Sequence, residues 1–219
     1  MTAEPPPSPV TEAVRSLEVR WIFPGQLEAT VARWFSRFPA TTESREDTYL
    51  LDPRLHALSV KVRAGEALEV KVYRGSRGIL QVPGRAHGRL EAWQKWSFPC
   101  GPLGQDSADR AGWQPVRKRR RISRFSRPGE PAAAGAPVPG GQACCAVELT
   151  EVRTRGQDWW TLGFEATGPA DLLHGELQAT AAFVFAQPLP AGVEPGPDYS
   201  RSYAAWLGRP SGAESDADT

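Results

Sequence analysis

The stretch Leu58–Tyr73, LSVKVRAGEALEVKVY, consists of two short runs in which apolar and polar side chains alternate. Because successive side chains of an extended strand point to opposite faces, the first run places Lys61 and Arg63 opposite its apolar residues. The pattern restarts after the turn Ala64–Glu66, and Lys71 then takes the equivalent polar position. The stretch therefore predicts a β-hairpin with one apolar and one cationic face. Charged faces of antiparallel sheets are usually solvated, and the hairpin alone favours that interpretation.

The composition limits what the chain can be. With 219 residues, 40% of them hydrophobic, it can bury one substantial core. The net charge is only +1, so any binding of anions must depend on local clusters of cations. No apolar run reaches membrane-spanning length, and the proline-rich N-terminus does not resemble a signal peptide, so we expect a cytoplasmic protein without a membrane partner. The three cysteines form neither a disulfide framework nor a metal-binding motif.

Alternation of the same kind recurs on both sides of the hairpin. Leu17–Phe23 predicts a strand that carries Glu18 and Arg20 on its polar face. Further strands are predicted at 45–51, 89–98, 113–125, 144–153 and 159–166, with Gly75–Gly88 as a polar connection. Apolar residues at helical spacing predict a helix over 27–38, and further helices are predicted over 171–185 and 200–207.

The predicted strand Trp113–Phe125, WQPVRKRRRISRF, carries the densest positive charge in the chain. Its period of two places Lys118 and Arg120 on the face of the neighbouring apolar residues. Three other arginines, Arg117, Arg119 and Arg121, fall on the opposite face. Taken alone, the segment fits a solvated edge strand guarded by charge, a nuclear-type signal or a nucleic-acid patch.

The two ends of the chain and one internal segment have compositions that do not support a packed core. The lead 1–14 contains PPPSP and the tail 208–219 is polar and acidic, so both are predicted to be disordered. Residues 127–142 are rich in proline, alanine and glycine and are predicted to form a flexible loop within the sheet. Residues 15–207 are predicted to form a single domain.

The predicted strands are short, antiparallel and polar on one face, where lysine or arginine occurs together with glutamate. A small closed barrel keeps one face of every strand inward. If the charged faces point inward, they line a channel with cations and a few carboxylates. Unpaired buried charge is strongly unfavourable, so such a channel indicates a polyanionic ligand.

The order of these motifs resembles the CYTH superfamily of triphosphate tunnel enzymes, which includes class IV adenylyl cyclases, thiamine triphosphatases and inorganic triphosphatases. The resemblance extends over roughly residues 17–207 and is carried by LSVKVR, ALEVK, RLEAW, VRKRR, CAVELTEV and the Ser202-Tyr203 pair. It implies a mainly β fold (α+β), in which an antiparallel eight-stranded closed barrel with peripheral helices encloses a tunnel. It also implies that the tunnel binds a triphosphate, a polyphosphate or a nucleotide.

Applied position by position, the resemblance assigns roles to individual side chains. The implied substrate-binding cations are Arg20, Lys61, Arg63, Lys71, Arg89, Lys118 and Arg120. Glu91 is implied as a further inward acid. The implied ligands of Mg²⁺ or Mn²⁺ are Glu18, Glu148 and Glu165, of which Glu18 and Glu165 would take part in catalysis.

The sequence departs from the metal-binding pattern of this superfamily on two strands. The first-strand signature E-x-E-x-K reads EVRWI here, with Arg20 in the second acidic position and Ile22 in place of the lysine. On the last strand, E-x-E is reduced to Gly163 followed by Glu165. Hydrolysis of a triphosphate uses a divalent ion, held by several oxygen ligands, to polarise the phosphoryl group and orient water. The sequence therefore predicts binding of an anion more strongly than its hydrolysis.

Three hypotheses follow from the sequence. The chain is a divergent metal-dependent triphosphatase, or it is a non-catalytic module that binds a phosphorylated ligand or nucleotide in the same tunnel. In the third hypothesis, Arg117–Arg121 form an external patch for RNA, whose binding would depend steeply on salt. RNP-type aromatic motifs are absent from the sequence, which argues against nucleic acid as the partner.

Overall fold

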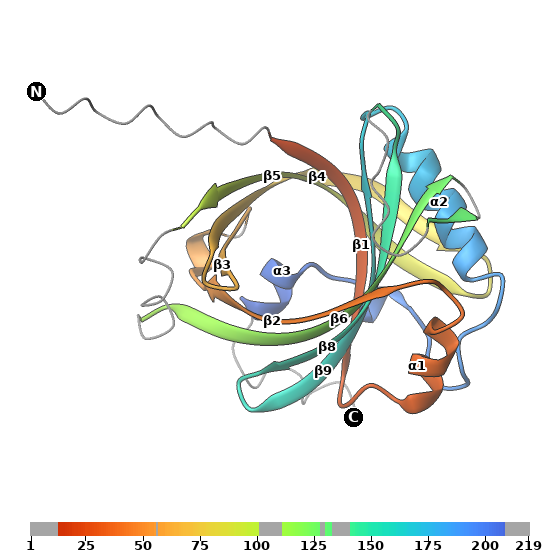
Figure 1. The fold of residues 1–219 in the computed structure, drawn as a ribbon, viewed down its shortest axis with the longest axis horizontal. Coiled ribbons are helices and arrows are strands. Elements are labelled where there is room, and N and C mark those ends of the chain that lie inside the picture. Colours follow the sequence, from red (N-terminus) through yellow and green to blue (C-terminus); the bar gives the residue numbers. More distant parts are fainter. Residues whose placement is uncertain (1–12, 56, 101–110, 128–129, 133–140, 209–219) are drawn as a thin grey trace, which may run out of the picture.

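The computed structural model describes residues 13–55, 57–100, 111–127, 130–132 and 141–208. Its main feature is a closed antiparallel β-barrel of eight strands with one short additional strand, as predicted (Figure 1). The barrel strands are β1 (Val14–Pro24), β2 (Thr41–Leu50), β3 (Leu58–Arg63), β4 (Ala67–Val82), β5 (Ala86–Pro99), β6 (Trp113–Arg127), β8 (Cys144–Thr154) and β9 (Gln157–Thr167). Their order is β2-β3-β4-β5-β1-β9-β8-β6, and pairing of β2 with β6 closes the ring. The additional strand β7 (Glu130–Pro131) pairs with β6.

In the part of the chain that the structure describes, three short α-helices accompany the barrel. Helices α1 (Ala29–Phe35) and α2 (Leu173–Val184) lie outside the ring, beside β1 (Figure 1). Helix α3 (Tyr203–Leu207) lies within the outline of the ring in the same view. The described residues also include the 3₁₀ segments Pro53–Leu55 and Pro197–Tyr199. None of the helices in the described ranges is long and apolar enough to cross a membrane.

The larger hydrophobic core lies outside the barrel, between the strands and the helices α1 and α2. On β1, Leu17, Val19, Trp21 and Phe23 belong to this core. Phe35 of α1 is fully buried in this core. The aromatic residues of the helical segment lie on one face because that face packs against the strands. The alternation of β1 therefore directs Glu18 and Arg20, which lie between these apolar residues, into the barrel.

A smaller core lies inside the barrel, at the end where α3 is found. Trp206 packs edge-on against Trp159 of β9, with ring centroids 5.2 Å apart, and Tyr203 stacks against Tyr49 of β2. The side chain of Ser202 caps the helix by accepting a hydrogen bond from the backbone of Ala205 at 3.3 Å. Residues before and within α3 line the internal cavity, so the helix forms one end of it.

The opening hairpin forms as predicted, with β3 paired to β4 in antiparallel register. The prediction of a polar connection over Gly75–Gly88 is wrong, because β4 continues to Val82 and β5 begins at Ala86. Gly75 and Gly78 have positive φ angles of 108° and 92°, and the register of β4 with β5 shifts twice near them. These glycines allow β-bulges, which interrupt the alternation while the strand continues.

Much of the predicted disorder falls outside the described residues. Outside them lie residues 1–12 of the predicted lead, 128–129 and 133–140 of the predicted loop and 209–219 of the predicted tail. Val14 belongs instead to β1, and Glu130–Pro131 form β7. The disorder of these segments and the single-domain boundaries stay predictions.

Candidate functional site

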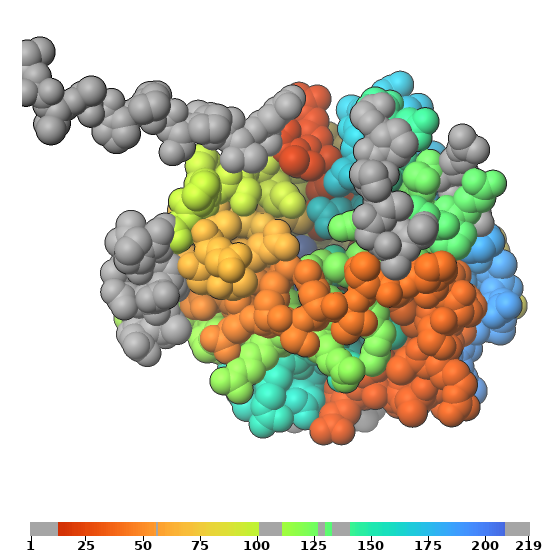
Figure 2. All heavy atoms as spheres, viewed as in Figure 1, coloured from red at the N-terminus to blue at the C-terminus, as the bar shows by residue number. Residues whose placement is uncertain are grey.

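The barrel encloses a cavity of about 260 Å³. Space-filling atoms cover most of the opening that the ribbon leaves inside the ring (Figure 2). All ten side chains that the sequence suggested for binding, catalysis or metal coordination line this cavity. They are Glu18, Arg20, Lys61, Arg63, Lys71, Arg89, Lys118, Arg120, Glu148 and Glu165. The structure therefore places these residues around one cavity, whereas their roles in binding or catalysis stay predictions.

The cavity lining is strongly cationic. Among the described residues, eleven lysine and arginine side chains line it, against six glutamates. This excess of positive charge contrasts with the net charge of +1 for the whole chain. Positive charge that is nearly balanced over the whole chain is therefore in excess at the cavity.

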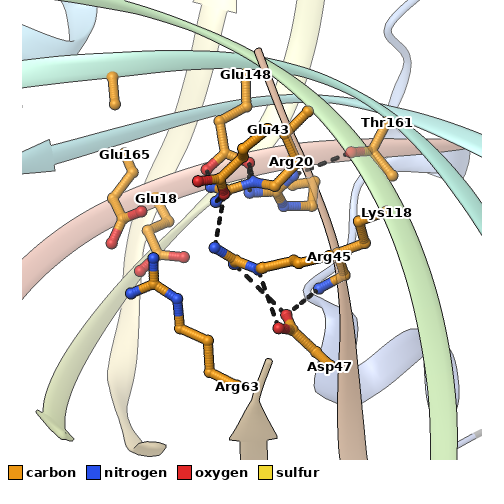
Figure 3. A network of polar contacts seen from close by, with 12 residues as sticks. Glu18, Arg20, Glu43, Arg45, Asp47, Arg63, Lys118, Glu148, Thr161 and Glu165 are labelled. Carbon is orange, nitrogen blue, oxygen red and sulfur yellow. Dashed lines mark hydrogen bonds and ion pairs between the residues drawn. The ribbon is translucent and has the colours of Figure 1, made fainter. Parts of the chain in front are cut away.

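Asp47 on β2 is the centre of one group of ion pairs (Figure 3). Its carboxylate lies 2.9 Å from Nζ of Lys118, 3.1 Å from Nζ of Lys61 and 3.0 Å from Nε of Arg45. Burial by itself would raise the pKa of Asp47, but these cations, Lys118 first, hold it below its usual range. Nζ of Lys118 also donates a hydrogen bond to the hydroxyl of Tyr49 at 2.6 Å, and it lies over the ring of Tyr203.

Glu148 on β8 is the centre of a second group. Its carboxylate accepts hydrogen bonds from Arg120 and lies 3.5 Å from the guanidinium of Arg20. Burial would raise the pKa of Glu148, but Arg120 and then Arg20 lower it well below its ordinary value. Arg20 also donates a hydrogen bond to Thr161 at 3.0 Å and lies over the ring of Tyr203.

Lys71 on β4 joins two carboxylates from the neighbouring part of the barrel. Its Nζ lies 2.7 Å from Glu18 of β1 and 3.4 Å from Glu165 of β9. These two glutamates are direct partners in the antiparallel register of β1 and β9. Burial would lower the pKa of Lys71, but the charges of Glu165 and Glu18 raise it well above its ordinary value. The charge of Lys71 in turn lowers the pKa of Glu165.

Glu69 on β4 holds the two cations of β3, Lys61 and Arg63. It lies 3.0 Å from Nζ of Lys61 and 3.4 Å from Nη1 of Arg63. Burial opposes ionisation of Glu69, but Lys61 first and then other cations lower its pKa to about 2. Solvation of this face, which the hairpin alone favoured, is therefore wrong for Lys61, whose side chain is 12% exposed. Arg63 remains 44% exposed at the cavity.

The two departures from the family pattern lie next to each other. Arg20 and Gly163 are direct partners in the register of β1 and β9. A Cβ atom at position 163 would lie only 2.8 Å from Cζ of Arg20. The guanidinium of Arg20 thus occupies the space that any side chain at position 163 would need.

The three glutamates expected to bind a divalent ion are each paired with a cation of the chain. Lys71 holds Glu18 and Glu165, and two arginines hold Glu148. Within the described ranges, no group of three or more histidine, cysteine, aspartate or glutamate side chains is arranged to hold a metal ion. The described side chains therefore do not fit Mg²⁺ or Mn²⁺ in this arrangement.

The arginines on the outer face of β6 lie outside the cavity, as the alternation predicted. Arg117 pairs with Glu46 at 2.9 Å, and Arg121 pairs with Glu151 at 3.1 Å. Arg119 lies 3.9 Å from the same Glu151. Each outer arginine thus has an acidic neighbour, so this surface carries mixed charge.

Several residues of the cavity were not identified as candidates from the sequence. They are Glu43, Arg45, Glu69, Lys95, Arg124 and Arg201. Glu43 and Arg45 belong to the segment TESRED, which is polar on both faces and gives no periodic signal of which face is inward. Only the predicted closure of the barrel could have indicated that one face of this segment is enclosed.

Comparison with known proteins gives no assignment: no protein-family model matches the chain, and no curated protein matches it.

Proposed function

We propose that this chain binds a small phosphorylated anion of the triphosphate or polyphosphate type, or a nucleotide, inside its barrel and without a divalent metal ion. The observation that supports this proposal is the excess of cationic side chains around one enclosed cavity. Arginine and lysine are the side chains that proteins use to bind phosphate oxygens. The cavity volume of about 260 Å³ limits the ligand to a small one.

The energetic cost of this interior supports a role in binding. Buried ion pairs contribute little net stability, and well-packed apolar residues of similar volume often stabilise a protein as much or more. A barrel needs no charged interior in order to fold, as the apolar contacts around α3 illustrate inside the same barrel. A polyanionic ligand would give the excess cations a function.

Metal-dependent hydrolysis of a triphosphate receives less support. The glutamates that the resemblance assigns to the metal are neutralised by Lys71, Arg20 and Arg120. When bound, Mg²⁺ or Mn²⁺ would polarise a phosphoryl group. Phosphate release from tripolyphosphate, ATP or thiamine triphosphate with either metal, above the rate of a Glu165→Ala variant, would establish this second activity.

Isothermal titration of the full chain with tripolyphosphate, pyrophosphate and ATP in the presence of EDTA tests the binding proposal. We expect saturable binding that weakens as salt screens the attraction between charges. Absence of both a binding isotherm and a thermal shift with all three anions would overturn the proposal.

A pair of arginine variants locates the binding site. Arg63→Ala removes a cation of the cavity and should weaken tripolyphosphate binding about tenfold, the effect of one charge-assisted interaction. Arg119 is 58% exposed on the outer face of β6, so Arg119→Ala should leave the affinity within about twofold. An equal loss in both variants would favour the outer arginine surface instead of the cavity.

A further inference from the structure

Glu43 on β2 lies between two arginines of the cavity. Its Oε1 atom accepts a hydrogen bond from Nη1 of Arg45, two residues along the same strand, at 2.6 Å. The same oxygen accepts a hydrogen bond from Nη1 of Arg120, its partner in register on β6. Two guanidinium groups therefore converge on a single carboxylate oxygen. Figure 3 shows the contact of Glu43 with Arg45.

A more deeply buried carboxylate fixes each of these arginines from another side. Arg120 pairs through Nε and Nη2 with Glu148, whose side chain is 6% exposed. Arg45 pairs through Nε with Asp47, whose side chain is 0% exposed. The two Nη1 groups are thereby oriented toward one point in the cavity by residues other than Glu43.

Glu43 differs from these buried anchors in its access to water. Its side chain is 38% exposed, although it lines the cavity. A carboxylate that already contacts water can turn into solvent at far lower cost than one buried in the protein. Glu43 is therefore the acid of this group that an incoming anion can displace most easily.

We infer that Arg45 and Arg120 form a subsite for one phosphoryl group, which Glu43 occupies until a phosphorylated ligand displaces its carboxylate. This inference rests on the proposed function and names the part of the cavity where a phosphoryl group binds. A phosphoryl group offers more negative charge and more acceptor oxygens to paired guanidinium groups than a carboxylate does. A ligand with a single carboxylate gains little by replacing Glu43, so the exchange selects for phosphorylated ligands.

A Glu43→Gln variant of the full chain tests this exchange, since it keeps the size of the side chain and removes its charge. We expect tripolyphosphate, titrated in EDTA, to bind about tenfold more tightly, which corresponds to about 1.4 kcal/mol. Adding Arg45→Ala to this variant should abolish the gain. A Glu43→Ala variant should bind more tightly as well, and serves if Glu43→Gln does not fold, as judged by thermal unfolding.

Glu46→Gln is the matched control, because Glu46 lies on the same strand and is 41% exposed, but pairs with the outer Arg117. It should leave the affinity unchanged. If the unmodified chain binds tripolyphosphate and Glu43→Gln binds equally or less tightly, the subsite is wrong while the proposed function stands. If neither binds, the proposed function itself is overturned. If only Glu43→Gln binds, the ligand does not displace Glu43 in the unmodified chain, and both the exchange and the proposed function are overturned.

Discussion

The guanidinium of Arg20 lies over Gly163, its register partner across β1 and β9, so closely that a Cβ atom at position 163 would fall 2.8 Å from Cζ of Arg20. The arginine is held there by Glu148, by the hydroxyl of Thr161 and by the ring of Tyr203. The large cation at one position thus requires the absence of a side chain at the other. The two departures from the tunnel-enzyme pattern form one local arrangement.

The first prediction concerns this pair. Gly163→Ala should lower the free energy of unfolding by about 1–3 kcal/mol, because the added methyl group overpacks the site and displaces a buried guanidinium. In an Arg20→Ala background the same change should cost much less. Urea denaturation of the single and double variants should give a coupling energy of about 0.5–3 kcal/mol. Strictly additive costs would show that Arg20 does not restrict position 163.

The inward residues could be predicted wherever one face of a strand is apolar. On β1 the apolar residues mark the face that the helices cover, and this alternation correctly placed Glu18 and Arg20 in the barrel. The closure of the ring between β2 and β6 was expected only from the resemblance, because pairing between distant segments leaves no local signal. Bulges at glycine, as in β4, hide a continuing strand for a different reason, because they interrupt the alternation of side chains.

The ion-pair partners could not be predicted from the sequence. Asp47, which joins Lys61, Lys118 and Arg45, lies fourteen residues from one lysine and seventy-one from the other. Such contacts depend on how β2 lies between β3 and β6. The sequence thus identified the cations and the three glutamates expected to bind a metal, but not that these glutamates pair with the cations. This pairing changed the expectation of a metal site.

The second prediction concerns Asp47. Asp47→Asn should lower the free energy of unfolding by about 3–5 kcal/mol, because it leaves the buried ammonium of Lys118 without its charged partner. Asp52→Asn is a suitable control, since Asp52 pairs only locally with the exposed Arg54. Chemical denaturation at neutral pH measures both. A cost for Asp47→Asn as small as that of the control would contradict a central role for this carboxylate.

The third prediction concerns acid stability. The folded pKa of Glu69 is lowered from 4.5 to about 2, and those of Asp47 and Glu148 are lowered as well. A lowered folded pKa means that protonation favours the unfolded chain, so the stabilisation is present above the unfolded pKa and is lost below it. The midpoint of thermal unfolding should therefore fall steeply between pH 4.5 and about pH 2. Glu69→Gln should make the unfolding temperature depend less on pH. The same dependence on pH as in the unmodified chain would show that Glu69 does not contribute to acid stability.

The fourth prediction concerns α3 as the end of the cavity. Trp206 is 6% exposed and packs against Trp159 and Tyr203. Trp206→Ala should cost about 3–5 kcal/mol, because a large buried ring is removed and the site cannot fully collapse. Phe183→Ala, at a 40% exposed position on α2, should cost clearly less in the same denaturation experiment. Equal costs would show that α3 is not an integral part of the barrel interior.

The fifth prediction concerns the lysine that neutralises two of the expected metal ligands. Lys71→Ala leaves Glu18 and Glu165, adjacent in the register of β1 and β9, without their shared ammonium. Two like charges enclosed together are unfavourable, so the variant should unfold at a lower temperature than the unmodified chain in EDTA. Mn²⁺ prefers carboxylate oxygens and should restore part of this loss by binding between the two glutamates.

The measurement is the temperature of thermal unfolding in EDTA and in Mn²⁺. Arg119→Ala on the outer face is the control, and its unfolding temperature should be the same in both conditions. If Mn²⁺ raises the unfolding temperature of Lys71→Ala but not that of the unmodified chain, the ammonium of Lys71 takes the place of a metal ion. A shift of equal size in the unmodified chain would mean that Lys71 does not block metal binding, and the claim that anions bind without a metal would then be contradicted. If Mn²⁺ does not raise the unfolding temperature of Lys71→Ala, the two glutamates cannot share an ion. The reason would be that too few oxygen ligands remain, because Arg20 and Gly163 stand where the resembling enzymes carry acids.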